Sequence, residues 1–490
     1  MLKVLLALAL ASVPVMAATC ESLTALRLPG TVITSSQTVP AGDFTAPGSR
    51  APLKNLPAFC RVAATLKPTA DSDIKIEVWL PLAAWNRKYQ AVGNGGWAGV
   101  ISYSALVDAL RAGYATSSTD TGHVGGSGSF ALGHPEKLID FGWRSVHEMT
   151  VRSKAIVDAF YGSAPRLSYW NGCSTGGRQG LKEAQRFPAD YDGIIAGASA
   201  NRTALALWVA FAELKDPASV IPKAKYAAVH RAAIAACDAN DGLKDGLIEN
   251  PAKCRFDPKT IECKGADGPE CLTAPQVEAA RKIYAEAKNP RTGRNLFPSL
   301  APGSELGWAV LGGGPEPSPI ILDQYKYVVF RNPAWDWRTF DFDKDIVRSD
   351  TPENLVMNAT DPNLSQFFGH NGKMILYHGW ADPNISPFST VEYYKSVIDS
   401  AARGTKPSDS IRLFLEPGMG HCGGGEGPNT FDKVGALENW VEKGKAPDKI
   451  IASHATKGVV DRTRPLCPYP QVATWKGSGN TDEAANFICK

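Results

Sequence analysis

The sequence has almost no net charge and no long run of one sign. In its 490 residues, 52 Lys and Arg stand against 49 Asp and Glu, which gives a formal charge of +3. Nucleic-acid binding needs concentrated positive charge, so we expect no nucleic-acid partner. Beyond the N-terminus no apolar run reaches the roughly 18 residues that a membrane span requires, so we expect no membrane partner. The ten cysteines include no C-x-x-C pair, which argues against a zinc ribbon or a thioredoxin-type motif.

The composition is that of a packed globular protein. Hydrophobic residues make up 44% and charged residues 21%, which excludes a disordered or collagen-like chain. The 46 Gly and 35 Pro predict many loops and tight turns. The length indicates one large domain or two associated domains.

The N-terminus has the pattern of an export signal. Lys3 precedes an apolar run over residues 4–15, and Ala17 offers a small-residue cleavage site. We therefore predict a signal peptide over residues 1–17 and a secreted or periplasmic protein. An uncleaved N-terminal anchor is the alternative. A lipid anchor on Cys20 fits poorly because Thr19 precedes it.

Export makes disulfides the expected state of the cysteines, since an even count in an oxidising compartment indicates pairing. The count alone does not give the connectivity. Local spacing suggests four pairs, namely Cys20–Cys60, Cys237–Cys254, Cys263–Cys271 and Cys467–Cys489. Cys173 and Cys422 remain, far apart in the sequence.

Ser174 is the candidate nucleophile. It lies in Gly-Cys-Ser-Thr-Gly (residues 172–176), between a short β-prone run and a segment, 178–186, with a helical pattern. Gly-x-Ser-x-Gly at a strand-to-helix turn is the nucleophile-elbow pattern, in which the strained turn holds the hydroxyl clear of the sheet. The alternative is a glycine-rich turn that carries an ordinary serine.

His421 is the candidate base. It lies in a glycine-rich loop, residues 417–425, after a strand-like run, so its imidazole can reach the top of a sheet. His123 is the chief rival, but it precedes the serine and breaks the order Ser, acid, His of this elbow class. His378 lies within an apolar run and is interpreted as a hydrogen-bonded core residue.

Asp382 is the candidate orienting acid, because it follows the apolar run 373–377 and lies between the serine and the histidine. An Asx turn is the alternative interpretation, since Asp-Pro often begins one. Asp192, shortly after the helical segment, is interpreted as a capping or turn residue. If Cys173 and Cys422 pair, the neighbouring Ser174 and His421 lie side by side.

Three motifs together resemble one family. Gly-Cys-Ser-Thr-Gly-Gly (172–177), Gly-Trp-Ala-Asp-Pro (379–383) and Gly-His-Cys (420–422) resemble the tannase and feruloyl esterase family of α/β-hydrolases, which includes the bacterial hydrolase of mono(hydroxyethyl) terephthalate. The resemblance covers nearly the whole mature chain. It implies an α/β-hydrolase fold, a Ser-His-Asp triad with an acyl-enzyme, and the disulfide Cys173–Cys422 beside the triad.

Ser174 and Asp382 are 208 residues apart, far more than one or two βα units require. We therefore expect a large insertion, a lid over residues 200–370, between core segments 18–199 and 371–490. The resemblance implies a lid at this point.

The lid sequence contains an Asp-rich, glycine-rich loop at 237–249, and such hard oxygen ligands suit Ca²⁺. The spacing departs from an EF-hand, because Gly242 occupies the fifth position. The resemblance implies a structural calcium bound by the side chains of Asp238, Asp241 and Asp245 and the carbonyls of Leu243 and Leu247. A solvated Asp-Gly turn held by Cys237–Cys254 is the alternative.

Two backbone amides are expected to stabilise the oxyanion. The elbow predicts the amide of Thr175. A glycine loop after the strand-like run 89–92 offers the second, and the resemblance points to Gly96; a plain turn is the alternative.

Aromatic and charged residues of the expected lid bear on the substrate. Aromatic residues crowd the segment 325–342, where they can stack on an acyl group but for the most part are expected to form the core of the lid. Trp308 is a weaker pocket candidate. We identify no lid arginine for a terephthalate carboxylate, which favours a feruloyl (hydroxycinnamoyl) or galloyl ester over mono(hydroxyethyl) terephthalate. A serine peptidase and a non-catalytic calcium-stabilised binding protein are the other function classes.

Overall fold

The structure is a computed structural model that describes residues 18–202, 207–401 and 406–490. The predicted signal peptide, residues 1–17, lies outside this range. Within the described residues, no helix is long and apolar enough to cross a membrane.

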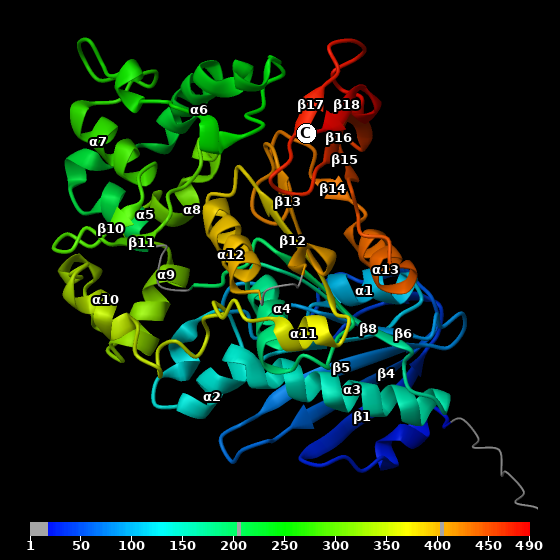
Figure 1. The fold of residues 1–490 in the computed structure, drawn as a ribbon. Helices are drawn as coiled ribbons and strands as arrows, with labels where there is room; N and C mark the ends of the chain where they lie inside the picture. Colours follow the sequence, from blue (N-terminus) through cyan, green and yellow to red (C-terminus); the bar gives the residue numbers. More distant parts are fainter. Residues whose placement is uncertain (1–17, 203–206, 402–405) are drawn as a thin grey trace, which may run out of the picture.

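A nine-stranded mixed sheet forms the centre of the molecule (Figure 1). Its strands, in spatial order, are β1 (Thr31–Val39), β4 (Phe59–Leu66), β5 (Ile74–Pro81), β7 (Ala115–Thr119), β6 (Lys88–Val92), β8 (Leu167–Cys173), β9 (Gly193–Gly197), β12 (Lys373–Gly379) and β13 (Ile411–Glu416). The pairs from β1 to β7 are antiparallel, and those from β7 to β13 are parallel. Parallel strands are covered on both faces, which explains why strands such as β7 and β9 are buried along their whole length.

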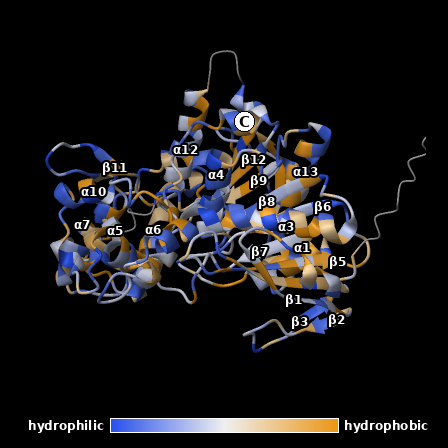
Figure 2. Ribbon diagram, turned by 90° about the horizontal axis from the view of Figure 1, so that it is seen from below, coloured by the Kyte–Doolittle hydropathy of each residue, from blue (hydrophilic) through white to orange (hydrophobic). Residues whose placement is uncertain are grey.

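Helices cover both faces of this sheet. The helices of one face are α3 (Ser145–Tyr161), α4 (Thr175–Arg186) and α12 (Pro387–Ser400), and those of the other are α1 (Tyr103–Arg111) and α13 (Lys433–Lys443). Figure 2 shows apolar residues along the strands between these layers. The result is an α/β-hydrolase fold, as the sequence predicts.

Between β9 and β12 the chain forms a separate group of short helices beside the sheet (Figure 1). Its helices are α5 (Leu207–Leu214), α6 (Lys223–Cys237), α7 (Ala274–Ile283), α8 (Ala309–Gly312), α9 (Pro319–Asp323) and α10 (Lys344–Ser349), with the strands β10 (Ala287–Lys288) and β11 (Asn295–Phe297). This group has its own apolar cluster, drawn from residues 210–346. Most aromatic residues of 325–342 pack in that cluster, as expected.

Smaller elements complete the chain. They are α2 (Pro135–Ile139), α11 (Ser365–Gly369), the hairpin β2 (Gly42–Phe44) and β3 (Leu53–Leu56), the three-stranded sheet β14 (Thr430–Phe431), β15 (Ile450–Thr456) and β16 (Val459–Leu466), and the pair β17 (Ala473–Trp475) and β18 (Phe487–Cys489). Phe367 of α11 packs into the core of the sheet rather than into the inserted group.

All ten cysteines are paired, and all five predicted disulfides are present. Cys173–Cys422 joins the end of β8 to the loop after β13, with 5.9 Å between the Cα atoms and a sequence separation of 249.

Candidate active site

Ser174 lies at a sharp turn between β8 and α4. Its backbone angles are φ 62° and ψ −120°, a conformation that costs energy for any residue with a Cβ. The turn is fixed from both sides, because the amide of Ser174 donates to the Gly197 carbonyl (2.9 Å) and the Ser174 carbonyl accepts from Arg178 (3.0 Å). This is the geometry of a nucleophile elbow.

Glycine at position 172 is required by the close approach of the helix to the strand. A Cβ on Gly172 would lie 2.4 Å from the carbonyl oxygen of Gly176, which is backbone and cannot move away. The sequence pattern around Ser174 therefore has a steric cause in the structure.

Asp382 and His421 form a hydrogen-bonded pair. The Nδ1 of His421 donates to Oδ2 of Asp382 over 2.6 Å, and Asp382 is fully buried at the end of β12. Two backbone amides, those of Asn384 and Ile385, donate to the other carboxylate oxygen at 2.7 and 3.0 Å. The arrangement fixes the tautomer of His421 that leaves Nε2 free to accept a proton.

His378 is a second partner of Asp382. Its Nε2 donates to Asp382 Oδ2 (3.0 Å), and its Nδ1 accepts from the Thr390 hydroxyl (2.7 Å). Burial by itself raises the pKa of Asp382, but the hydrogen bonds from His378 and His421 lower that pKa below its ordinary value. The carboxyl group therefore stays ionised. The sequence predicts a hydrogen-bonded core histidine at 378 but not its bond to Asp382.

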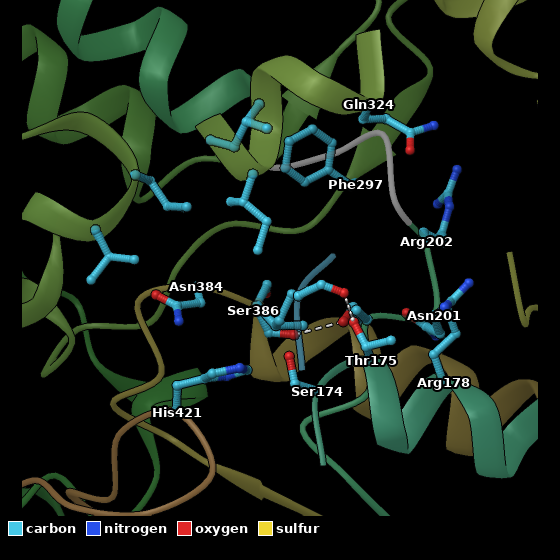
Figure 3. Close-up of a pocket in the computed structure, with 18 of the residues that line it drawn as sticks. Ser174, Thr175, Arg178, Asn201, Arg202, Phe297, Gln324, Asn384, Ser386 and His421 are labelled. Atoms are coloured by element: carbon cyan, nitrogen blue, oxygen red, sulfur yellow. Dashed lines mark hydrogen bonds between the residues drawn. The ribbon is translucent and has the colours of Figure 1, made fainter. Parts of the chain in front are cut away.

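Ser174 and His421 line the same pocket (Figure 3). The His421 ring points toward the Ser174 side chain, although no hydrogen bond joins them in the described structure. Such bonds are often long without substrate. The disulfide between their neighbours, Cys173 and Cys422, holds the two loops together.

The predicted oxyanion donors also lie at this pocket. Gly96 and Thr175 line it, and the Thr175 hydroxyl donates to the Gly96 carbonyl over 2.9 Å. Gly96 has φ 52°, and a Cβ there would lie 3.1 Å from Ile320. The two loops are therefore tied together beside the serine.

The walls of the pocket are mainly apolar and come from both the sheet region and the inserted group. They include four aromatic residues, Trp97, Phe141, Trp208 and Phe297, and several aliphatic ones. None of the aromatic residues of 325–342 is among the lining residues, and Trp308 is fully buried in the apolar cluster of the insertion. These pocket aromatics were not predicted, because neither their spacing nor their neighbours mark them.

Polar side chains lie at the end of the pocket away from His421 (Figure 3). Arg178, Asn201, Arg202 and Gln324 are drawn there, and the described residues that line the pocket include no Asp or Glu. Arg178 is 1% exposed and donates to the carbonyls of Met357 (3.2 Å) and Phe141 (3.5 Å). Burial alone lowers its pKa to about 10, and none of the ion pairs among the described residues includes it.

The rival histidine has a different setting. The Nε2 of His123 donates to the Trp97 carbonyl (2.7 Å), and its ring stacks on Phe130 with 3.8 Å between centroids. It does not line the pocket. Asp192 accepts from the amide of Ser168 in β8 (2.7 Å), so its side chain joins two distant segments and does not cap the elbow helix.

The predicted calcium loop follows α6. Asp238 accepts from the amides of Asp245 and Gly246, both at 3.1 Å, and Asp241 accepts from the amide of Leu243 at 2.9 Å. Burial and the negative charges of Asp245 and Asp238 raise the pKa of Asp241. This crowding of hard oxygen donors fits Ca²⁺.

Two features of the loop differ from a closed calcium cage. The three carboxylates do not all approach within 4.8 Å of one another. Asp245 also pairs with Arg464 of β16, and Arg462 donates to the Asp245 carbonyl (3.0 Å). The loop is therefore attached to the C-terminal sheet through Asp245.

The fold and the strand–turn–helix site define the class of this protein, which is an α/β-hydrolase. The family model for tannase and feruloyl esterase matches residues 60–490. The chain belongs to this family, and it is a carboxylic ester hydrolase.

Individual relatives agree with this assignment. An uncharacterised esterase of Xanthomonas campestris pv. campestris is 41% identical, covering 96% of this chain and 91% of the relative. A probable feruloyl esterase B-1 of Aspergillus fumigatus is 35% identical, with 87% and 85% covered. The crystal structure of feruloyl esterase B from Aspergillus oryzae superposes with a TM-score of 0.91 at 31% identity, covering 96% of this chain and 99% of that chain.

Proposed function

We propose that this protein is an exported serine esterase that hydrolyses esters of hydroxycinnamic or gallic acid through Ser174, His421 and Asp382. One observation carries the proposal: Ser174 and His421 line one largely apolar pocket that has four aromatic residues in its walls. Such walls suit an aromatic acyl group. The disulfides indicate a non-cytosolic protein, which agrees with export.

The proposed reaction follows from the hydrogen bonds of the site. Nε2 of His421 takes the Ser174 hydroxyl proton as Oγ attacks the ester carbonyl carbon, and Asp382 holds Nδ1–H and stabilises the imidazolium. The amides of Thr175 and Gly96 donate to the oxyanion. Collapse expels the alcohol, which receives the proton from Nε2, and leaves an acyl-enzyme. Water then releases the aromatic acid by the same steps.

The insertion, residues 200–370, is proposed to act as a lid. Support comes from the pocket itself, since Trp208, Phe297, Ile320 and Gln324 of the insertion line it together with Ser174. Substrate would enter between the two parts, and an apolar cover would exclude water from the acyl group.

A structural calcium in this lid is also proposed, held by the oxygens of Asp238, Asp241, Asp245, Leu243 and Leu247. The crowded carboxylates support it, because a divalent cation would offset their mutual repulsion. The ion supplies structural support to the loop, and no step of the hydrolysis involves it.

A monoester of terephthalate, such as mono(hydroxyethyl) terephthalate, is the second candidate substrate. Arg178 and Arg202 line the pocket, and no Asp or Glu is among its described lining residues, which favours an acyl group with a second, negatively charged end. Arg202 belongs to the proposed lid. The sequence alone did not indicate which lid arginine could contact a terephthalate carboxylate.

Parallel turnover of methyl ferulate, methyl gallate and mono(hydroxyethyl) terephthalate tests the proposal. We expect the highest kcat/KM for one of the two neutral aromatic esters and a loss of all activity in Ser174→Ala. A preference for the terephthalate ester that Arg202→Ala abolishes would replace the first candidate by the second. Failure on all three, with intact folding, would contradict the aromatic-ester proposal.

A further inference from the structure

A second cluster of ligand-type side chains lies away from the pocket, between α3, α4 and the loop after α4. It consists of His147, Glu183 and Asp190, each of which offers one ligand atom within 4.8 Å of the other two. We propose that these three side chains bind a divalent transition-metal cation, for which Zn²⁺ is the probe.

Glu183 lacks the hydrogen bonds that a buried carboxyl group normally has. It is fully buried, and neither of its carboxylate oxygens has a hydrogen-bond partner among the described residues. Burial of a carboxylate without a partner is costly, and such groups are rare in folded proteins unless an ion or water satisfies them. The unpartnered carboxylate faces His147 and Asp190 at ligand distance, which points to a cation there.

His147 and Asp190 provide the open side of the site. Nδ1 of His147 donates to Oδ2 of Asp190 over 2.7 Å, and their side chains are 26% and 15% exposed. The imidazole stacks on Phe187 with 3.7 Å between ring centroids, which fixes its orientation. A cation can therefore reach the buried Glu183 from solvent and retain water ligands on the outer side.

The ligand set selects the class of metal. Imidazole together with carboxylates suits Zn²⁺ and its neighbours in the first transition row, whereas Ca²⁺ and Mg²⁺ prefer oxygen ligands alone. Three protein ligands with open positions for water are common in zinc sites. Binding of the cation to Nδ1 would break the His147–Asp190 hydrogen bond and move the imidazole proton to Nε2.

Protonation of Glu183 provides the competing explanation. Burial and the neighbouring Asp190 raise the pKa of Glu183 well above its ordinary value, while the charge of Lys154, which donates to the Asp190 carbonyl, acts in the opposite direction. In that account the buried acid is neutral and no metal binds. The two accounts differ in whether the intact protein takes up a cation at this place.

The position of the cluster sets the expected effect. Helix α4 begins directly after Ser174, and the cation would join it to α3 without contacting substrate. Zn²⁺ is therefore expected to raise the melting temperature and leave kcat nearly unchanged.

The test is titration of the full-length, metal-stripped and Ca²⁺-saturated protein with Zn²⁺ by calorimetry. We expect the wild type to bind one Zn²⁺ more than Glu183→Gln or His147→Ala. His454→Ala is the matched control, because His454 also donates to an aspartate, Asp461 (2.6 Å), but belongs to no three-ligand cluster. It should bind as the wild type does.

Equal zinc uptake by the wild type and both variants would overturn the proposal, as would no uptake by the wild type. His147→Ala keeps the test decisive if Glu183→Gln does not fold, since the His147 side chain is partly exposed whereas Glu183 is fully buried. In that case, a Zn²⁺-induced rise in melting temperature that persists in His147→Ala overturns it equally.

Discussion

At the scale of single residues, Ser174 shows how backbone strain serves a side chain. Its positive φ projects the hydroxyl from the turn, and the bonds to Gly197 and Arg178 hold that conformation in place. The strain belongs to the backbone, so it remains when the hydroxyl is removed.

Replacement of the nucleophile separates chemistry from folding. Ser174→Ala should reduce kcat/KM for an aromatic ester by at least about 1,000-fold, because the group that forms the acyl-enzyme is lost. Alanine fits the same turn, so the melting temperature should change by only a few degrees. Ester hydrolysis and thermal melting of the same sample check both parts. Activity within tenfold of the wild type would eliminate Ser174 as the nucleophile.

Residues marked by local motifs could be predicted, and residues brought in by tertiary packing could not. Ser174, Asp382 and His421 each follow a strand-like run in a glycine-rich or proline-containing loop. Arg178 and Trp97 line the same pocket, but nothing in their neighbouring sequence distinguishes them from buried helix and loop residues.

At the scale of elements, the sequence predicts the parallel strands and the elbow helix better than the insertion. Strands β8, β12 and β13 are short, largely apolar or β-prone runs that lead into loops containing glycine or proline, so their order fixes the site. Helices such as α8 and α10 have four and six residues, which is too short for a periodic pattern. The sequence predicts that the aromatic residues of the insertion form its core, but it does not predict which short helices pack around them.

The disulfide Cys173–Cys422 joins two of these elements at the site. By chain entropy, a crosslink across this separation contributes up to about 5 kcal/mol. It also holds the loops of Ser174 and His421 in register, and a displacement of about 1 Å between reacting groups can cost on the order of 100-fold in rate.

Replacing both cysteines by serine should therefore lower kcat as well as stability. We expect kcat to fall by roughly 10- to 100-fold when it is measured at least 15 °C below the melting point of the variant. The Cys467–Cys489 double variant is the control, since that disulfide joins the residue after β16 to β18 and touches no triad loop. A near wild-type kcat in the Cys173/Cys422 variant would show that the bridge serves stability alone.

At the scale of the whole molecule, His230 links the insertion to the loop that carries His421. It lies on α6 between two carboxylates, and its ring nitrogens are 2.8 Å from Glu305 and 2.8 Å from Glu426. Burial by itself lowers the pKa of His230, but the hydrogen bonds and charges of Glu305 and Glu426 raise it above its ordinary value. Tyr284 also donates to Glu305.

This link should weaken at alkaline pH. A raised folded-state pKa means that the stabilisation is complete below the unfolded pKa of about 6.5 and is lost as pH rises through the folded value. His230→Gln should therefore lower the free energy of unfolding by on the order of 2–4 kcal/mol at pH 6 and by less at pH 9. Denaturant unfolding at both pH values measures this difference. A difference that is equal at both values would show that His230 does not carry the charge.

The predicted calcium loop forms a second contact between the insertion and the rest of the molecule, in addition to the contact through His230. Asp245 of this loop pairs with Arg464, and Glu249, just after it, accepts from the amide of Ala473. A cation that orders the loop would therefore also hold the insertion against the C-terminal strands. The triad lies on other loops and has no bond to this one in the described residues.

Removal of calcium should thus affect stability more than chemistry. We expect a chelator to lower the melting temperature by about 5–10 °C, since a shift of 2–4 °C per kcal/mol is typical for large domains, while kcat at 25 °C stays within twofold. Chelators also remove transition metals, so one sample of the metal-stripped protein receives Ca²⁺ and a second receives Zn²⁺. Ca²⁺ should restore the melting temperature, and Zn²⁺ alone should not. Asp238→Asn should melt at the lower temperature and lose its response to Ca²⁺, because Asp238 contributes charge without contacting Arg464. An unchanged melting temperature in chelator, with no calcium detected in the protein by elemental analysis, would leave the loop as an Asp-Gly turn closed by Cys237–Cys254.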